Sequence, residues 1–230
     1  MNVEIESLRR CSKLNENLDN WKRLFNLAWL FLESIGLSKE DWTLGGGTTL
    51  MIHYNHRISN DIDIFFSDAQ YITYLTPRLN DTVSQYVDSY NEQSNSLKLI
   101  FEFGEIDFIV APRLTPEPYV VLNIEGKAVN TESPQEIAIK KIFYRAETLK
   151  ARDIIDIAVV IKNCKDSLLK YLNIYSSKVH SALERLDIIR PNYKEALRQM
   201  EIINKELADH APDIVEEFLK ECIKRAEDAK

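Results

Sequence analysis

Apolar residues recur at helical spacing near the start of the chain and through most of its second half. Between residues 14 and 35 they fall three and four positions apart, and Gly36 is placed to end the helix that this spacing predicts. From Ser133 onward the pattern stays helical. The helices that it predicts cover residues 134–148, 151–163, 166–187, 191–209 and 212–228.

Between these stretches, polar and apolar residues alternate as they do in β-strands. The alternation predicts strands over residues 61–66, 97–103 and 105–110, the last two joined tightly at Gly104, and one or two more within 119–130. A chain with strands first and helices afterwards is typical of an α+β fold.

The segments between the strands are less regular. We expect a helix over residues 68–90 that Pro77 interrupts, and a polar loop from Asn91 to Ser96. Three prolines within residues 112–118 predict an irregular connection. The whole pattern favours a mixed β-sheet flanked by helices over residues 1–130, followed by a helical domain over residues 131–230.

Charge and composition narrow the classes of protein. The net charge of −7 argues against broad, nonspecific binding of nucleic acid, which depends on neutralising phosphates. No apolar run approaches the roughly 18–20 residues of a membrane span. Because the acidic N-terminus lacks the apolar core of a signal peptide, we expect a cytoplasmic protein. The three cysteines and four histidines show none of the spacings typical of zinc sites.

Two acids on the first predicted strand are candidates for a metal site. Asp61 and Asp63 lie two residues apart, so their side chains are expected on one face, while Ile62 and Ile64 point to the core. Two neighbouring carboxylates repel each other unless a cation lies between them. Their hard oxygen atoms suit Mg²⁺ or Mn²⁺.

A third acid, Asp107, is flanked by apolar residues in the last of the predicted strands. Unpaired in the core it would be costly. On a strand next to Asp61 and Asp63, it would complete a three-carboxylate site for one or two metal ions.

A glycine-rich segment precedes these acids. Gly45, Gly46 and Gly47 lead to Thr48, which is placed to cap a short helix whose backbone N–H groups would face phosphate oxygens. Taken separately, a pair of acids two residues apart is most often solvated surface, and a glycine-rich loop is most often only a turn. Their combination and order favour a site for phosphoryl transfer.

The two blocks together resemble the polymerase-beta-like nucleotidyltransferases, and more closely the AbiEii/AbiGii toxin branch. The matching residues are Leu44-Gly45-Gly46-Gly47-Thr48-Thr49-Leu50 and His56-Arg57-Ile58-Ser59-Asn60-Asp61-Ile62-Asp63-Ile64-Phe65. A later block also matches, with Lys140-Lys141, Arg145, Arg152-Asp153 and Asp156. The resemblance covers roughly residues 40–165 and implies a nucleotidyltransferase-type sheet.

The resemblance implies that the protein transfers a nucleoside monophosphate from an NTP to an acceptor hydroxyl and releases pyrophosphate. It implies that Gly46, Gly47 and Thr48 hold the triphosphate, while Asp61 and Asp63 bind the metal ions. Asp107 would be the third ligand and the general base. Related toxins act on the 3′ end of tRNA and have a cognate antitoxin, which makes tRNA or another RNA, and an antitoxin, the expected partners.

The residues of the later block have roles that the resemblance leaves partly open. Lys141, or its neighbour Lys140, would contact phosphate, and Asp156 or Asp153 would orient that region. The two lysines point about 100° apart on a helix. We favour Lys141, because Arg145 lies one turn away on the same face.

The basic residues also have plainer explanations. Arg152 with Asp153 or Asp156 would equally form ordinary ion pairs between helices. Arg57 and Ser59 would either reach phosphate or fix their own loop. Two other functions stay open: nucleotidyl transfer to a protein or small molecule, and a nucleotide-binding or interaction module without turnover.

Overall fold

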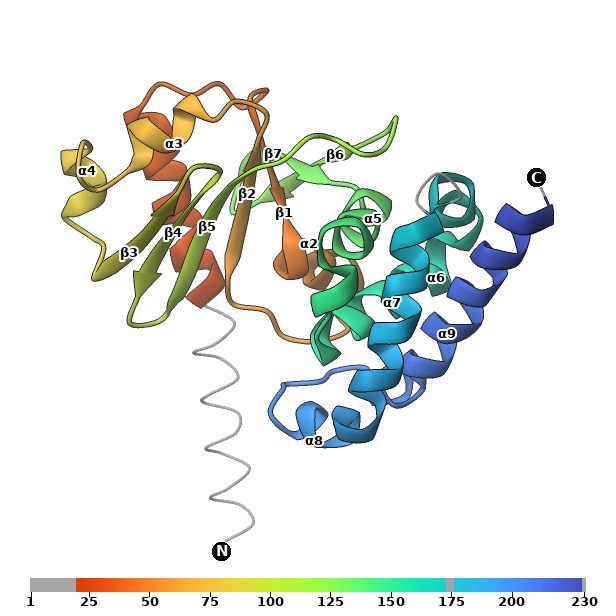
Figure 1. Ribbon diagram of the computed structural model, residues 1–230. Coiled ribbons are helices and arrows are strands. Elements are labelled where there is room, and N and C mark those ends of the chain that lie inside the picture. Colours follow the sequence, from red (N-terminus) through yellow and green to blue (C-terminus); the bar gives the residue numbers. More distant parts are fainter. Residues whose placement is uncertain (1–19, 173–175, 229–230) are drawn as a thin grey trace, which may run out of the picture. The chain divides into compact units, whose positions relative to one another are not determined.

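The computed structural model describes residues 20–172 and 176–228, which form two compact units (Figure 1). The first, the sheet unit, comprises the described residues up to Thr48 together with residues 59–112 and 121–131. The second, the helical unit, comprises residues 49–58, 113–120 and the described residues from Glu132 onward. The helical unit therefore takes in two short segments from the N-terminal part of the chain.

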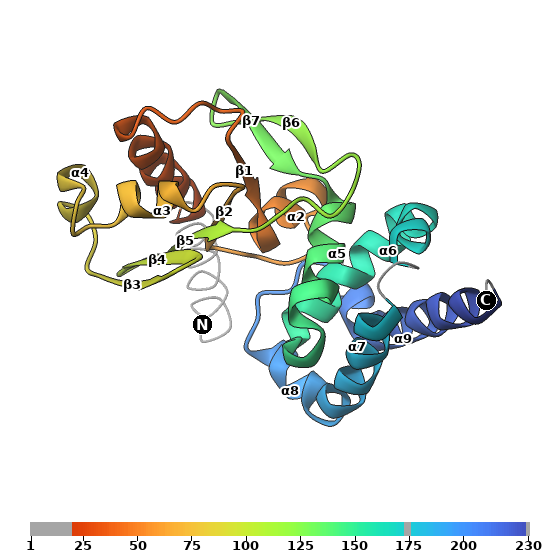
Figure 2. The ribbon, with the colours of Figure 1, turned by 45° about the horizontal axis from the view of Figure 1, so that its top comes forward.

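A seven-stranded mixed sheet carries the first unit, in the order β3-β4-β5-β2-β1-β7-β6 (Figure 2). Its strands are β1 (Trp42–Gly45), β2 (Ile62–Phe66), β3 (Ser89–Gln93), β4 (Ser96–Phe101), β5 (Gly104–Val110), β6 (Tyr119–Ile124) and β7 (Lys127–Glu132). β2 runs parallel to β5 and β1 parallel to β7, whereas β1–β2, β3–β4 and β4–β5 are antiparallel. The expected α+β fold with a mixed sheet is confirmed.

Alternation of polar and apolar residues explains the central strands. In β2, Ile62, Ile64 and Phe66 are buried, while Asp63 and Phe65 between them are half-buried. β4 and β5 show the same period. The strands predicted over residues 61–66, 97–103 and 105–110 are therefore confirmed to within a few residues.

The segment between β2 and β4 differs from the expectation. The predicted helix over residues 68–90 consists of two short helices, α3 (Gln70–Leu75) and α4 (Asp81–Ser84). The predicted loop from Asn91 to Ser96 is wrong, because most of it lies in β3 or β4. All five residues of β3 are exposed, so its strand is held by backbone pairing with β4 at the sheet edge, and no apolar pattern marks it.

The first predicted helix ends where the sequence indicates. Residues 20–34 are helical, and Leu14 and Leu18 of the prediction lie outside the described residues. Gly36 has a φ of 67°; its N–H donates to the Glu33 carbonyl, and the next N–H, that of Leu37, donates to the Leu32 carbonyl. This pair of bonds is a Schellman motif, which glycine favours because the motif needs a positive φ.

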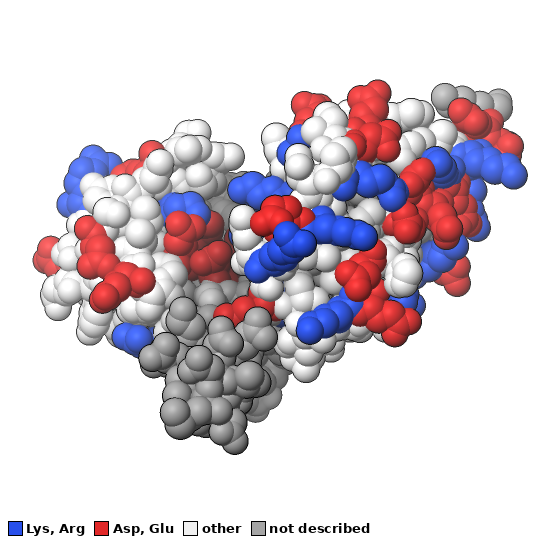
Figure 3. Space-filling view, turned by 90° about the horizontal axis from the view of Figure 1, so that it is seen from below, with Lys and Arg blue, Asp and Glu red and all other residues white. Residues whose placement is uncertain are grey.

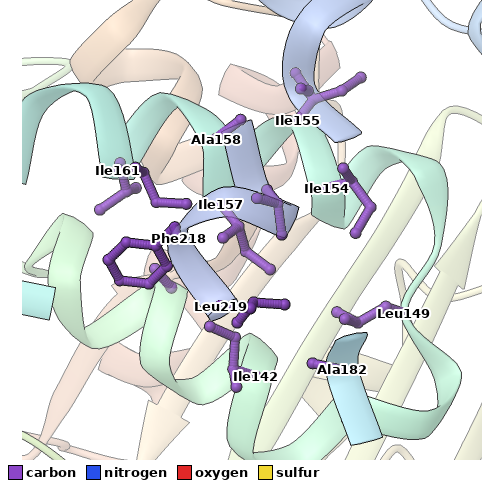
Figure 4. Close-up of a cluster of buried hydrophobic side chains, with 14 of the residues drawn as sticks. Ile142, Leu149, Ile154, Ile155, Ile157, Ala158, Ile161, Ala182, Phe218 and Leu219 are labelled. Carbon is purple, nitrogen blue, oxygen red and sulfur yellow. The ribbon is translucent and has the colours of Figure 1, made fainter. Parts of the chain in front are cut away.

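The helical unit packs its helices around one apolar cluster (Figure 4). The helices are α5 (Pro134–Arg145), α6 (Ala151–Leu172), α7 (Ser176–Ile189), α8 (Tyr193–Arg198) and α9 (Lys205–Asp228). Side chains from all five of them belong to the cluster, among them Ile142 of α5, Ile157 of α6, Ala182 of α7, Tyr193 of α8 and Leu219 of α9. A further helix, α2 (Gly46–Tyr54), begins in the sheet unit and contributes Leu50 to this cluster.

Helix boundaries in this unit agree with the prediction at one place and depart from it at two. The predicted break after residue 163 coincides with a kink in α6 (Ala151–Leu172), where Cys164 has non-helical angles. The helix predicted over 191–209 is interrupted, since residues 199–204 are not helical and residues 201–204 pair with residues 56–58. α9 passes through Pro212, where burial of its apolar face outweighs the lost backbone bond.

Charged side chains of both signs are interspersed over the helical unit in the view of Figure 3. Several of them form ion pairs, such as those of Arg190 with Asp213 and of Lys220 with Glu216. Among the described residues, no helix combines the length and apolar character that crossing a membrane requires.

The apolar cluster is expected to supply much of the stability of the helical unit. Leu219→Ala removes a fully buried side chain and should lower the free energy of unfolding by roughly 2–5 kcal/mol, because a cavity replaces its contacts. Ile188→Ala is the control, since Ile188 is 63% exposed and should cost less than about 0.5 kcal/mol. Denaturant titration of both variants measures the difference; equal losses would contradict the position of this core.

Candidate functional site

Three neighbouring strands place a lysine and two acids in one row across the sheet. The parallel register of β2 and β5 sets Asp63 opposite Asp107, and the antiparallel register of β4 and β5 sets Lys98 opposite Asp107. On the other side of Asp63, the row continues to Gly45 of β1. Directly paired residues share a face of a sheet, so these side chains are neighbours.

Asp107 is in an unfavourable environment for a charged carboxylate. Burial raises its pKa, and the charge of Asp63 raises it further. The Lys98 ammonium, whose Nζ lies 3.0 Å from Asp107 Oδ2, offsets only part of this effect, and the pKa of Asp107 stands at about 6. The pair of acids is thus short of positive charge in this structure.

Lys98 is a member of the row that the sequence analysis missed. Its ammonium donates to Glu105 as well as to Asp107. The signal was present, because Leu97 and Leu99 on either side are buried and the alternation therefore turns Lys98 to the same face as Asp107. A lysine in a strand is so ordinary that its pattern alone indicated no function.

Gly46 is fitted against the carboxylate of Asp63. It has a φ of 70°, and a Cβ at this position would lie 1.8 Å from Asp63 Oδ2. The predicted glycine loop is wrong in one respect, because β1 ends at Gly45 and α2 begins at once with Gly46. Gly46 and Gly47 therefore form the first turn of the helix.

Thr48 also has a different role from the predicted helix cap. It lies inside α2, and its hydroxyl donates to the backbone carbonyl of Asp61 at 2.5 Å. This bond ties the start of α2 to the residue immediately before β2. Thr48 is fully buried, so its hydroxyl fixes the backbone between the two sequence blocks.

Asp61 is half-buried and immediately precedes β2. Its Oδ1 lies 3.8 Å from the position that a Cβ on Gly104 would take. Among the residues that the structure describes, no three His, Cys, Asp or Glu side chains are grouped closely enough to hold a metal ion. The adjacent carboxylates of Asp63 and Asp107 fit a hard divalent cation, because it would relieve the repulsion that raises the pKa of Asp107.

In the helical unit, Asp156 is the centre of a buried polar network. It is fully buried and accepts hydrogen bonds from His56 Nε2 at 2.8 Å and from Arg57 Nε and Nη2 at 2.7 Å each. Lys141 Nζ lies 3.0 Å from its second oxygen. Burial alone would raise the pKa of Asp156, but Arg57, Lys141 and the bond from His56 hold this pKa well below its usual value.

Asp153 extends this network along α6. Lys141 Nζ donates to it at 2.6 Å, and Arg145 Nη1 lies 3.5 Å from it. Lys140 contacts Glu132 and Glu136 instead. Lys141 and Arg145 therefore share a face that Lys140 does not, as the helical spacing indicated, and Arg152 is exposed without an ion pair to any described residue.

The segment that carries Arg57 is held by backbone pairing with residues 201–204. The Ile58 N–H donates to the Glu201 carbonyl, and the carbonyl of His56 accepts from the N–H groups of Ile203 and Asn204. Arg57 also donates to the carbonyl of Ile58. Of the two alternatives, the observed contacts of Arg57 are those of a residue that fixes its own loop. Ser59, the next candidate along the chain, is half-buried.

Substitution of Gly46 tests its fit against Asp63. Gly46→Ala should lower the free energy of unfolding by about 3 kcal/mol or more, because a left-handed backbone and a direct clash with Asp63 both oppose the methyl group. Gly36→Ala is a matched control: its φ is 67°, but a Cβ there meets nothing within 4 Å, so only about 1 kcal/mol of backbone strain is expected. Equal losses in denaturant titrations would show that Asp63 does not occupy this space.

The raised pKa of Asp107 predicts a stability that depends on pH. Its pKa is about 6 in the folded protein and near 4 when unfolded, so the folded state holds the extra proton between these values, and stability falls as pH rises through them. In the presence of a chelator at pH 7.5, Asp107→Asn should therefore stabilise the protein by roughly 1–2 kcal/mol, after allowance for the exposed part of the side chain. This gain in stability should shrink towards pH 4. A gain that does not depend on pH would contradict the raised pKa of Asp107.

Comparison with known protein families identifies one that matches most of this chain. The family model described as "Nucleotidyl transferase AbiEii toxin, Type IV TA system" matches residues 30–228. Comparison with curated proteins gives no match.

Two solved structures share the fold. MenT4, a nucleotidyltransferase toxin from Mycobacterium tuberculosis H37Rv, has a TM-score of 0.58 at 12% identity, over 89% of this chain and 84% of that one. A putative nucleotidyltransferase from Helicobacter pylori has a TM-score of 0.50 at 14% identity, over 92% of this chain and 96% of that one. With a family model that covers most of its length, this chain belongs to the AbiEii family of nucleotidyltransferase toxins and is a transferase.

Proposed function

We propose that this protein transfers a nucleoside monophosphate from an NTP to an acceptor hydroxyl, with release of pyrophosphate, at the row formed by Asp63 and Asp107. The observation that carries the proposal is their direct pairing on parallel strands beside the first turn of α2. The pairing of two acids, in which Asp63 helps to raise the pKa of Asp107, has no purely structural explanation. A pKa shifted by burial and by a neighbouring charge is typical of functional sites.

Asp63 and Asp107, joined by Asp61, would hold Mg²⁺ or Mn²⁺, which supplies the positive charge that a triphosphate and two carboxylates need in order to approach each other. We assign Asp107 as the group that accepts the proton of the acceptor hydroxyl. Its half-buried carboxylate is more basic than that of an ordinary aspartate, because burial and the charge of Asp63 raise its pKa to about 6.

The first turn of α2 is the proposed phosphate-binding element. Gly46 and Gly47 carry N–H groups at a helix N-terminus and have no side chains of their own to cover them, and the helix dipole favours an anion there. The row of acids begins one strand away, since Gly45 at the end of β1 is paired with Asp63. Phosphate binding and the acids would thus be brought together by adjacent strands.

In the helical unit, we assign Lys141 and Arg145 to phosphate contacts, with the exposed Arg152 as a further candidate. Lys141 has three N–H donors, and Asp153 and Asp156 account for two of them. The two acids would act as positioning residues that orient the ammonium. The contacts of Lys140 with Glu132 and Glu136 give it no comparable role.

We further propose that the protein is the toxin of a toxin–antitoxin pair that acts on RNA, with the 3′ end of tRNA as the acceptor and a cognate antitoxin as partner. The description of its family and the name of MenT4 support the toxin role. An enzyme that consumes NTP would work in the cytoplasm. Transfer to a protein or small molecule is the alternative that the assay below separates.

Incorporation of labelled nucleotide tests the reaction. Each of the four labelled NTPs is incubated with the protein and total tRNA, and with protein and small-molecule pools in parallel. Asp63→Asn should reduce incorporation by at least about 10²-fold, because it removes a charge from the centre of the site without changing its shape. Asp88→Asn, at an exposed acid of the same unit, is the matched control and should retain full activity.

Each outcome of this assay has a distinct meaning. Label on tRNA supports the RNA acceptor, and label in the protein or small-molecule pool replaces that acceptor with another. Equal incorporation by the unaltered protein and Asp63→Asn would contradict the site. Binding of NTP without release of pyrophosphate would favour a module without turnover.

A further inference from the structure

Lys98 takes the place beside Asp107 that a cation would take. It reaches the acid across the β4–β5 pair, with Nζ 3.0 Å from Asp107 Oδ2. The carboxylate of Asp63 lies on the opposite side of Asp107 in the same row. Of the three side chains, Lys98 alone brings positive charge, so it is the counter-ion of the acid pair.

The same ammonium has a second carboxylate within reach. Lys98 forms an ion pair with Glu105, which lies on β5 two residues before Asp107 and on the same face. The side chain of Glu105 is 38% exposed and that of Asp107 is 23% exposed. The lysine therefore bridges a more solvated acid and a more buried one.

This arrangement permits exchange of one cation for another. If Lys98 leaves Asp107, it keeps Glu105 as a partner and stays partly solvated. Its release therefore costs less free energy than leaving a buried charge without a partner would. Asp107 without Lys98 is left with Asp63 as its nearest charged neighbour in the row and needs another cation. A divalent ion and Lys98 cannot both take the same oxygen of Asp107.

We propose that Lys98 is a built-in counter-ion that competes with the divalent cation for Asp107, and that Glu105 receives the lysine when the cation binds. The proposal rests on the function proposed above, because it assigns Asp63 and Asp107 to the cation. The lysine keeps the acid pair stable in the absence of the cation. The cost is a lower affinity for the cation.

Titration with Mn²⁺ alone, without nucleotide, tests this competition. Calorimetry or the electron paramagnetic resonance signal of free Mn²⁺ gives the dissociation constant of the full-length protein and its variants. Lys98→Met should bind Mn²⁺ about tenfold more tightly, because the competing charge is gone. Glu105→Gln should bind it several-fold more weakly, since the lysine then has only Asp107 as a partner and one nearby negative charge is lost.

The control is a lysine of the same unit in a similar ion pair. Lys22 lies 3.5 Å from Glu125, and their side chains are 41% and 37% exposed. Lys22→Met removes the same charge away from the acid row and should leave the Mn²⁺ affinity within twofold of the unaltered protein. Lys98→Gln, which keeps a hydrogen-bond donor but no charge, replaces Lys98→Met if that variant does not fold.

Thermal unfolding in a chelator gives a second readout. Lys98→Met should unfold at a lower temperature than the unaltered protein, and saturating Mn²⁺ should stabilise it by more degrees than it stabilises the unaltered protein. The proposal is overturned if Lys98→Met binds Mn²⁺ no more tightly than the unaltered protein, or if neither binds it. Nucleotide incorporation by the unaltered protein is measured separately, so incorporation together with unchanged Mn²⁺ affinity would overturn only this inference.

Discussion

The parallel pairing of β2 with β5 imposes the constraint on which the candidate site depends. It sets Asp63 directly beside Asp107, and two carboxylates at this spacing disfavour each other's charge. Two other features of the sheet unit accommodate this arrangement. Gly46 leaves room for the Asp63 carboxylate, and Lys98 gives Asp107 a partial counter-charge.

The helical unit contains the opposite arrangement of charge. Asp156 has Arg57, Lys141 and His56 around it, and its pKa is held well below the usual value although it is fully buried. A buried carboxylate that accepts several hydrogen bonds has its hydrogen-bonding capacity filled, and it holds the donor side chains in place. An acid beside another acid, as at Asp107, is poised to accept a cation or a proton. The contrast separates the residues that we assign to chemistry from those that we assign to positioning.

The sequence was sufficient to predict which acids form the candidate site, but not which side chains contact the acids of the protein. Strand patterns singled out Asp63 and Asp107 as acids among apolar residues, and the structure pairs these two residues directly on neighbouring strands. The network around Asp156 joins residues about a hundred positions apart, and no local pattern reports such contacts. His56 was missed for this reason, although it adjoins Arg57.

Errors in the predicted elements have the same origin. β3 has five exposed residues and is specified by pairing with β4, so it was taken for helix and loop. α9 continues through Pro212 because its buried face packs against the other helices, although proline alone would predict a break. Local preferences were overridden by tertiary contacts in both cases.

The most direct test of this account is the coupling free energy between Asp63 and Asp107. A double-mutant cycle with Asp63→Asn, Asp107→Asn and the double variant gives it from the free energies of unfolding, once in a chelator and once in saturating Mn²⁺. The account predicts an unfavourable interaction between the two carboxylates in the chelator and a favourable one with Mn²⁺. A coupling free energy near zero in both conditions, or one of the same sign and size in both, would contradict it.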